Sequence, residues 1–169
     1  MHTHKNIFRF WLLSLLLFLA ANCKQEDITL EETAIYEAVK GSIGFAFYKN
    51  DSSILESSDE SPHADFFRVR FNAIAQAALI DNGKLPADSV FPQGSLVVKE
   101  LYDSEAGEMT VLSVMKKDST NSNSINGWVW VEFEADGALH YSSGDKGGNC
   151  KSCHSNNDRD FVRLFNLFP

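Results

Sequence analysis

Residues 108–137 read EMTVLSVMKKDSTNSNSINGWVWVEFEADG and contain two apolar segments with a polar loop between them. Both segments are rich in residues favoured in β-strands, and the serine and asparagine of the loop are typical of a chain reversal. In the second segment, residues 127–137, valine and phenylalanine alternate with tryptophan and glutamate, so the two groups occupy opposite faces of a strand. The pattern predicts two neighbouring antiparallel strands.

The flanking sequence adds strands and a few helices. Asn72 stands where a helix N-cap belongs, ahead of AIAQAALID at residues 73–81. Residues 24–44 begin polar and then become mildly amphipathic, which indicates a tether followed by a helix. We therefore predict an α+β fold, a mainly antiparallel β-sheet with a few flanking helices. Further strands are expected at residues 66–71, 95–102 and 138–143.

The N-terminus has the layout of a bacterial export signal. Lys5 and Arg9 precede an uncharged apolar run at residues 10–22, which is shorter than the roughly 20 residues that a helix needs to cross a bilayer. The run ends at Cys23 in a pattern that resembles the lipobox of bacterial lipoproteins, in which this cysteine is acylated. Asn22 departs from the Gly, Ala or Ser that is usual there. The alternative is ordinary signal cleavage, with Cys23 as a free thiol.

This signal divides the chain into a lipoprotein signal peptide at residues 1–22, a tether at 23–30 and one folded domain at 31–169. Several acyl chains on Cys23 would hold the mature protein on a bacterial membrane, in the periplasm or at the cell surface. Loss of residues 1–22 leaves 13 basic and 23 acidic side chains, a formal net charge of −10. Such an acidic surface argues against nucleic acid as a partner.

The segment CKSCH, residues 150–154, has the spacing of a c-type haem attachment site. Cys150 and Cys153 can each form a thioether to a porphyrin vinyl group, while His154 reaches the iron as an axial ligand. We expect one covalent haem c, attached near the C-terminus. A structural zinc site would need four ligands and no second cysteine pair exists. A redox-active pair and a plain Cys150–Cys153 disulfide in a structural lipoprotein are the remaining alternatives.

The position of the motif bears on the sixth ligand of the iron. Only 15 residues follow His154, and none of them is Met or His. No sixth ligand therefore comes from that side, and we expect an open iron that suits a gas or a small nitrogen oxide. The alternative is a six-coordinate electron-transfer cytochrome. Its sixth ligand would come from Met109, Met115, His63 or His140.

Several motifs in order resemble the cytochrome P-460 family, which includes the cytochromes c′-beta. The resemblance covers roughly residues 64–165 and implies a mainly antiparallel sheet with a few helices, one c-type haem and frequent homodimers. It also implies a small ligand such as nitric oxide, and a redox partner protein if electrons are exchanged. The motifs are FPQGSLVVKELY (91–102), VLSVMKK (111–117), NGWVWVEFEADG (126–137), GNCKSCHS (148–155) and Asp160-Phe161-Val162.

Members of this family divide by chemistry. Some oxidise hydroxylamine with a haem cross-linked to a lysine, whereas the c′-beta type lacks the cross-link and binds nitric oxide or carbon monoxide. Lys99 is our candidate for the cross-linking position, with a solvent-facing strand lysine as the alternative role and Lys116 as a second choice. Whether the chain is an enzyme stays open at this level.

The resemblance also implies a distal arginine or an aromatic cap over the iron. Within FFRVRF, Arg68 and Arg70 share one strand face, and three apolar residues share the other. Either arginine is a candidate distal residue or a partner of a haem propionate, which a guanidinium binds well. For Phe67, Val69 and Phe71 we expect a core role.

Overall fold

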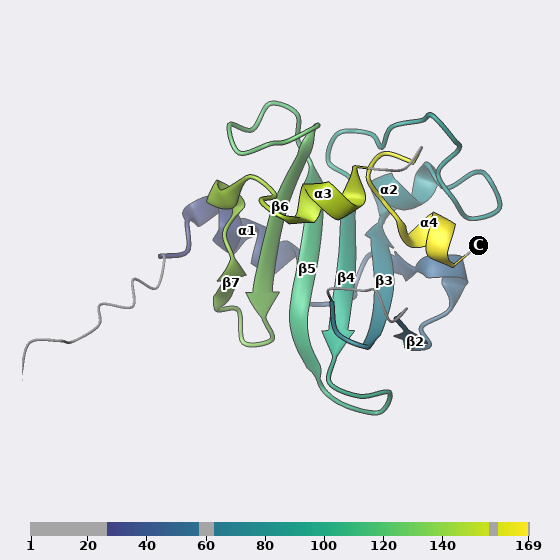
Figure 1. Ribbon diagram of the computed structural model, residues 1–169, viewed down its shortest axis with the longest axis horizontal. Helices are drawn as coiled ribbons and strands as arrows, with labels where there is room; N and C mark the ends of the chain where they lie inside the picture. The colour runs from purple at the N-terminus through teal and green to yellow at the C-terminus, as the bar shows by residue number, and fades with distance from the viewer. Residues whose placement is uncertain (1–26, 58–62, 156–158, 169) are drawn as a thin grey trace, which may run out of the picture.

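The structure is a computed structural model that describes residues 27–57, 63–155 and 159–168. The predicted signal peptide and Cys23 lie outside these residues. The described chain forms one seven-stranded, wholly antiparallel sheet in the order β1-β3-β4-β5-β6-β7, with β2 paired to β3 beside β1 (Figure 1). The strands are β1 (Phe45–Phe47), β2 (Leu55–Glu56), β3 (Phe66–Asn72), β4 (Leu96–Tyr102), β5 (Met109–Lys117), β6 (Trp128–Glu134) and β7 (Leu139–Tyr141).

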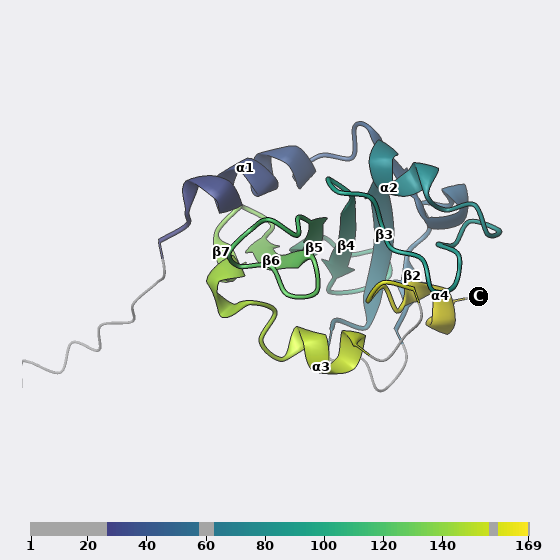
Figure 2. The same ribbon diagram turned by 90° about the horizontal axis from the view of Figure 1, so that it is seen from above.

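Short helices flank this sheet, so the predicted α+β class is confirmed. Figure 2 shows α1 and α3 on opposite sides of the sheet. None of the helices in the described residues has the length and apolar content needed to cross a bilayer. The helices are α1 (Leu30–Val39), α2 (Ala73–Ala77), α3 (Cys150–His154) and α4 (Leu164–Leu167), with 3-10 turns η1 (Tyr48–Asn50) and η2 (Ser143–Asp145).

The α2 helix begins where the sequence predicts and ends early. The Asn72 side chain accepts a hydrogen bond from the Ala75 amide, as an N-cap does. After Ala77 the chain must reverse at Asn82 and Gly83, which both have positive φ angles of 49° and 79°. The backbone leaves the helix to make this turn, so α2 is half as long as AIAQAALID suggests.

Helix α1 is fastened by a fully buried carboxylate. Glu32 forms a capping box with Thr29 and also accepts hydrogen bonds from the amide and hydroxyl of Ser143, at 2.8 and 2.9 Å. Burial opposes ionisation of Glu32, but these hydrogen bonds outweigh it and hold its pKa below the ordinary value. The predicted tether, residues 23–30, therefore overlaps a cap that belongs to the fold.

Strand alternation gives the sheet two different faces. One face packs against α1 through a cluster that includes Ile35, Val114 and Phe133. The other lies under α3 and α4, and carries Phe71, Trp128 and the remaining aromatic core. Across β3, β4 and β5, Val69, Lys99 and Ser113 stand in one row on this second face. The alternation predicted for residues 127–137 is confirmed, since Val129, Val131 and Phe133 pack on the α1 side.

Candidate cofactor site

The sheet face under α3 is hollowed into a cavity of about 180 Å³. The strands contribute an apolar floor, and the segment that follows α3 contributes an apolar wall through Val162, Leu164 and Phe168. Residues from four strands therefore meet the C-terminal segment around one space. The strand residues at the cavity are Phe67, Val69, Val97, Lys99, Ser113, Met115 and Trp130.

Cys150, Cys153 and His154 of the CKSCH segment all line this cavity. The segment is a short helix, α3, and residues three apart on a helix lie on one face, which brings Cys150 and Cys153 to the same side. Both thiols are free, and burial raises the pKa of the Cys150 thiol. The two sulfurs and the His154 imidazole are thus available to one ligand in the cavity.

His154 is oriented by a backbone carbonyl. Its Nδ1 lies 2.7 Å from the Phe161 oxygen. A carbonyl can only accept, so Nδ1 carries the proton and Nε2 keeps the lone pair that binds a metal. The ring also packs edge-on against Trp130, with 5.0 Å between centroids. Burial lowers the pKa of His154, which favours the neutral imidazole that a metal requires.

His63 is brought into the same cavity. Its ring centroid lies 6.4 Å from that of His154, and the two ring planes are nearly perpendicular at 84°. Burial, assisted by the nearby Lys99 and His154, lowers the pKa of His63 to about 4, so this imidazole is neutral at pH 7. Of the other sixth-ligand candidates, Met115 lines the cavity, Met109 packs on the α1 side, and His140 pairs with Glu134.

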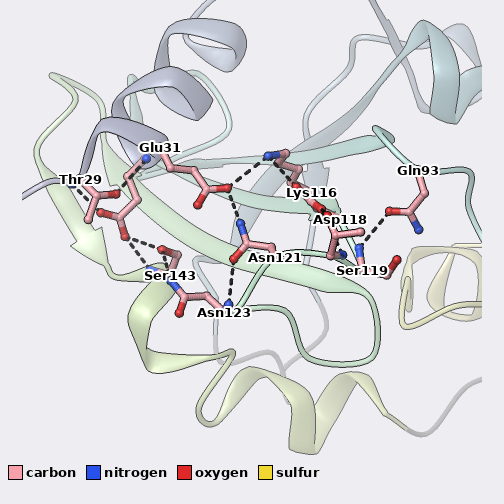
Figure 3. Close-up of polar contacts among 11 residues, drawn as sticks. Thr29, Glu31, Gln93, Lys116, Asp118, Ser119, Asn121, Asn123 and Ser143 are labelled. Carbon is pink, nitrogen blue, oxygen red and sulfur yellow. Dashed lines mark hydrogen bonds and ion pairs between the residues drawn. The ribbon is translucent and has the colours of Figure 1, made fainter.

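The two lysine candidates lie on opposite faces of the sheet. Lys99 is on the cavity side with Nζ 4.2 Å from the centre of the Phe67 ring, and burial lowers the pKa of its amine to about 8. The structure therefore places Lys99 in the cavity wall, unlike a solvent-facing strand lysine. Lys116 reaches Glu31 of α1 at 3.2 Å and Asp118 at 3.1 Å on the other face (Figure 3).

The two arginine candidates also lie on the α1 side, away from the cavity. Arg68 and Arg70 both bind the Glu100 carboxylate, Arg70 at 2.7 Å. Arg70 is 1% exposed and also donates to the carbonyls of Val39 and Gly41. The structure gives them a structural role in place of the expected distal or propionate role. Alternation along β3 turns Phe67 and Val69 toward the cavity, and the expected core role of Phe67, Val69 and Phe71 is confirmed.

Two cavity residues were missed by sequence reasoning. Arg163 and Trp130 line the cavity, and the buried Trp130 indole nitrogen has no hydrogen-bond partner among the described residues. Gly147 has a φ of +69°, and a Cβ there would come 2.9 Å from the Trp130 ring, so a larger residue would displace that ring. The adjacent glycines before CKSCH are the sequence signal of this close approach.

These residues fit a flat, mostly apolar macrocycle with acidic substituents. Apolar side chains form most of the wall, while Lys99, Arg163 and the Trp130 nitrogen supply donors for carboxylates. The two thiols and the imidazole are side chains that can supply covalent attachment and a metal ligand.

Comparison with known proteins gives one family match. A family model described as cytochrome P460 matches residues 46–163. No curated protein matches the chain. The matched range includes strands β2 to β7, α3 and the Asp160-Phe161-Val162 segment.

Proposed function

Because the chain belongs to the cytochrome P460 family, a family of haem proteins, we propose that it carries one haem c joined by thioethers to Cys150 and Cys153. His154 would be the axial ligand, through Nε2. The observation that carries this proposal is that all three side chains of the CKSCH motif line one cavity with a matching apolar wall.

We propose further that the protein binds a small nitrogen oxide, such as nitric oxide or hydroxylamine. Haem iron with one protein ligand supplies an open position that binds such molecules. The apolar side chains of the cavity, among them Phe67, Val69 and Phe168, would limit the access of water to this position. Lys99 is the candidate for a family-type cross-link, because it is in the cavity wall and Lys116 is not.

The six-coordinate alternative is favoured by one observation, the 6.4 Å between the ring centroids of His63 and His154. Two imidazoles that bind one first-row metal at about 2.0–2.1 Å have centroids roughly 6 Å apart. His63 is therefore the side chain best placed to close the sixth position, with Met115 as the other candidate in the cavity. In that case the protein would transfer electrons.

The absorption spectrum of the ferrous protein separates these two functions. We expect a five-coordinate, high-spin spectrum in the wild type, a new band on addition of nitric oxide, and the same coordination in His63→Ala. Met115→Leu tests the second candidate ligand in the same way and is also expected to leave the coordination unchanged. A low-spin six-coordinate wild-type spectrum that becomes high-spin in His63→Ala would overturn the open site and establish His63 as the sixth ligand.

The location of the protein is also a proposal. We propose that the mature chain begins at an acylated Cys23 and is held on a bacterial membrane, in the periplasm or at the cell surface. The apolar run before Cys23 and the two basic residues ahead of it support export. A redox partner protein and a homodimer remain predictions of the family resemblance.

A further inference from the structure

The carbonyl that orients His154 belongs to a strained turn. Asp160 and Phe161 have φ angles of 51° and 70°, in the left-handed region that bulky residues seldom occupy. Residues in such conformations are energetically unfavourable and persist only where the surroundings hold them. The Phe161 oxygen accepts the hydrogen bond from His154 Nδ1 at 2.7 Å, so the strain lies directly at the proposed iron ligand.

The restraint on this turn is a buried ion pair. Both carboxylate oxygens of Asp160 lie 2.8 Å from Lys117 Nζ, and the side chains of Asp160 and Lys117 are 4% and 6% exposed. The same carboxylate accepts a hydrogen bond from the Phe91 amide at 2.8 Å. The Asp160 carbonyl accepts another from Trp128 Nε1 at 3.0 Å. Asp160 is therefore held at both its side chain and its backbone.

These anchors connect the turn to the rigid sheet. Lys117 is the last residue of β5, and Trp128 is the first residue of β6, paired with it in register. Lys117 Nζ also lies 4.8 Å from the centre of the Trp128 ring. A buried ion pair contributes little net stability compared with apolar residues of the same size, so stability alone does not account for it.

We propose that the Lys117–Asp160 pair is a positioning device that fixes the Phe161 carbonyl on His154 Nδ1. Through that hydrogen bond, Asp160 and Lys117 would set the orientation and the basicity of the iron ligand. Neither Asp160 nor Lys117 is among the residues that line the cavity. They are positioning residues, and the inference rests on the proposed haem attachment at CKSCH.

The test is resonance Raman spectroscopy and redox titration of the haem-loaded full-length protein. Asp160→Asn keeps an acceptor for the Phe91 amide and weakens the tie to Lys117. A weaker hydrogen bond makes the imidazole a poorer electron donor, so we expect a lower iron–histidine stretching frequency and a more positive reduction potential. Lys117→Met removes the cation of the ion pair and should shift both quantities in the same direction. Lys117→Arg retains a cation and should keep both quantities close to the wild-type values.

Lys116→Met is the matched control, because Lys116 is the neighbouring residue of β5 and its ion pairs lie on the α1 side. It should leave both quantities unchanged. Folded, haem-loaded Asp160→Asn and Lys117→Met proteins with wild-type frequency and potential would overturn the inference. If Asp160→Asn fails to fold, Lys117→Met decides alone. Absence of covalent haem in the wild type on a denaturing gel would instead overturn the proposed function.

Discussion

Replacement of both Cys150 and Cys153 by serine is expected to abolish covalent haem. Serine hydroxyls do not form thioethers with vinyl groups, and both thiols line the cavity that we assign to the haem. After denaturing electrophoresis, the haem stain should be absent from the double variant and present in the wild type at equal protein load. Each single variant keeps one attachment point and should retain a weaker stain.

The matched control is Lys151→Ala, because Lys151 is exposed and lies between the two cysteines on α3. Its stain should equal that of the wild type. A stain of wild-type strength in the double serine variant would mean that the haem is attached elsewhere or not covalently bound by this motif.

Among the substitutions proposed for this protein, Glu100→Leu is expected to lower the free energy of unfolding most. Glu100 accepts hydrogen bonds from Arg68, Arg70 and Tyr102, and its loss leaves the Arg70 guanidinium buried without its carboxylate. Removal of one partner of a buried pair costs about 3–5 kcal/mol. Urea denaturation followed by circular dichroism measures this change. The double variant Glu100→Leu with Arg70→Met should recover much of the loss, because no buried charge is then unpaired.

The same substitution tests the assignment of the arginines to the α1 side. Covalent haem and the ferrous spectrum of Glu100→Leu should match the wild type, since Glu100 lies on the face away from the cavity. Burial acts to raise the pKa of Glu100, but hydrogen bonds from Arg68, Tyr102 and Arg70 lower it below the ordinary value. The stabilisation by Glu100 is therefore present above the ordinary glutamate pKa and is lost as the pH falls. The difference in free energy of unfolding between the wild type and Glu100→Leu should accordingly become smaller in acid. A spectral change without a stability loss would contradict this assignment.

The sequence predicted strands β3 to β7 because their apolar patterning is local, but it missed the short strands β1 and β2. It also placed Lys99 and Lys116 in strand segments, as the structure does in β4 and β5. Which face of each strand meets the cavity is a different question. The alternation within FFRVRF separates the arginines from the phenylalanines, but both groups are large and either face could have met the haem. The cross-strand register, together with the side on which α1 packs, decides that question.

The C-terminal segment was the least predictable part of the candidate site. Asp160 contacts Lys117, Phe91 and Trp128, which lie 32 to 69 residues away along the chain. No periodic pattern in a single sequence records such long-range contacts. His63 was one of four possible sixth ligands on sequence grounds, and folding separates it from Met109 and His140 by bringing it to the cavity.

The central claim is that CKSCH holds one covalent haem in this cavity, and intact-mass spectrometry of the denatured mature protein tests it most directly. We predict the mass of the acylated chain that begins at Cys23 plus one haem, with no free thiol on Cys150 or Cys153. After proteolysis, haem on a peptide that contains Lys99 would indicate the lysine cross-link of the hydroxylamine-oxidising members. A mass without haem, two hydrogens short of the free-thiol chain, would show a Cys150–Cys153 disulfide and contradict the account.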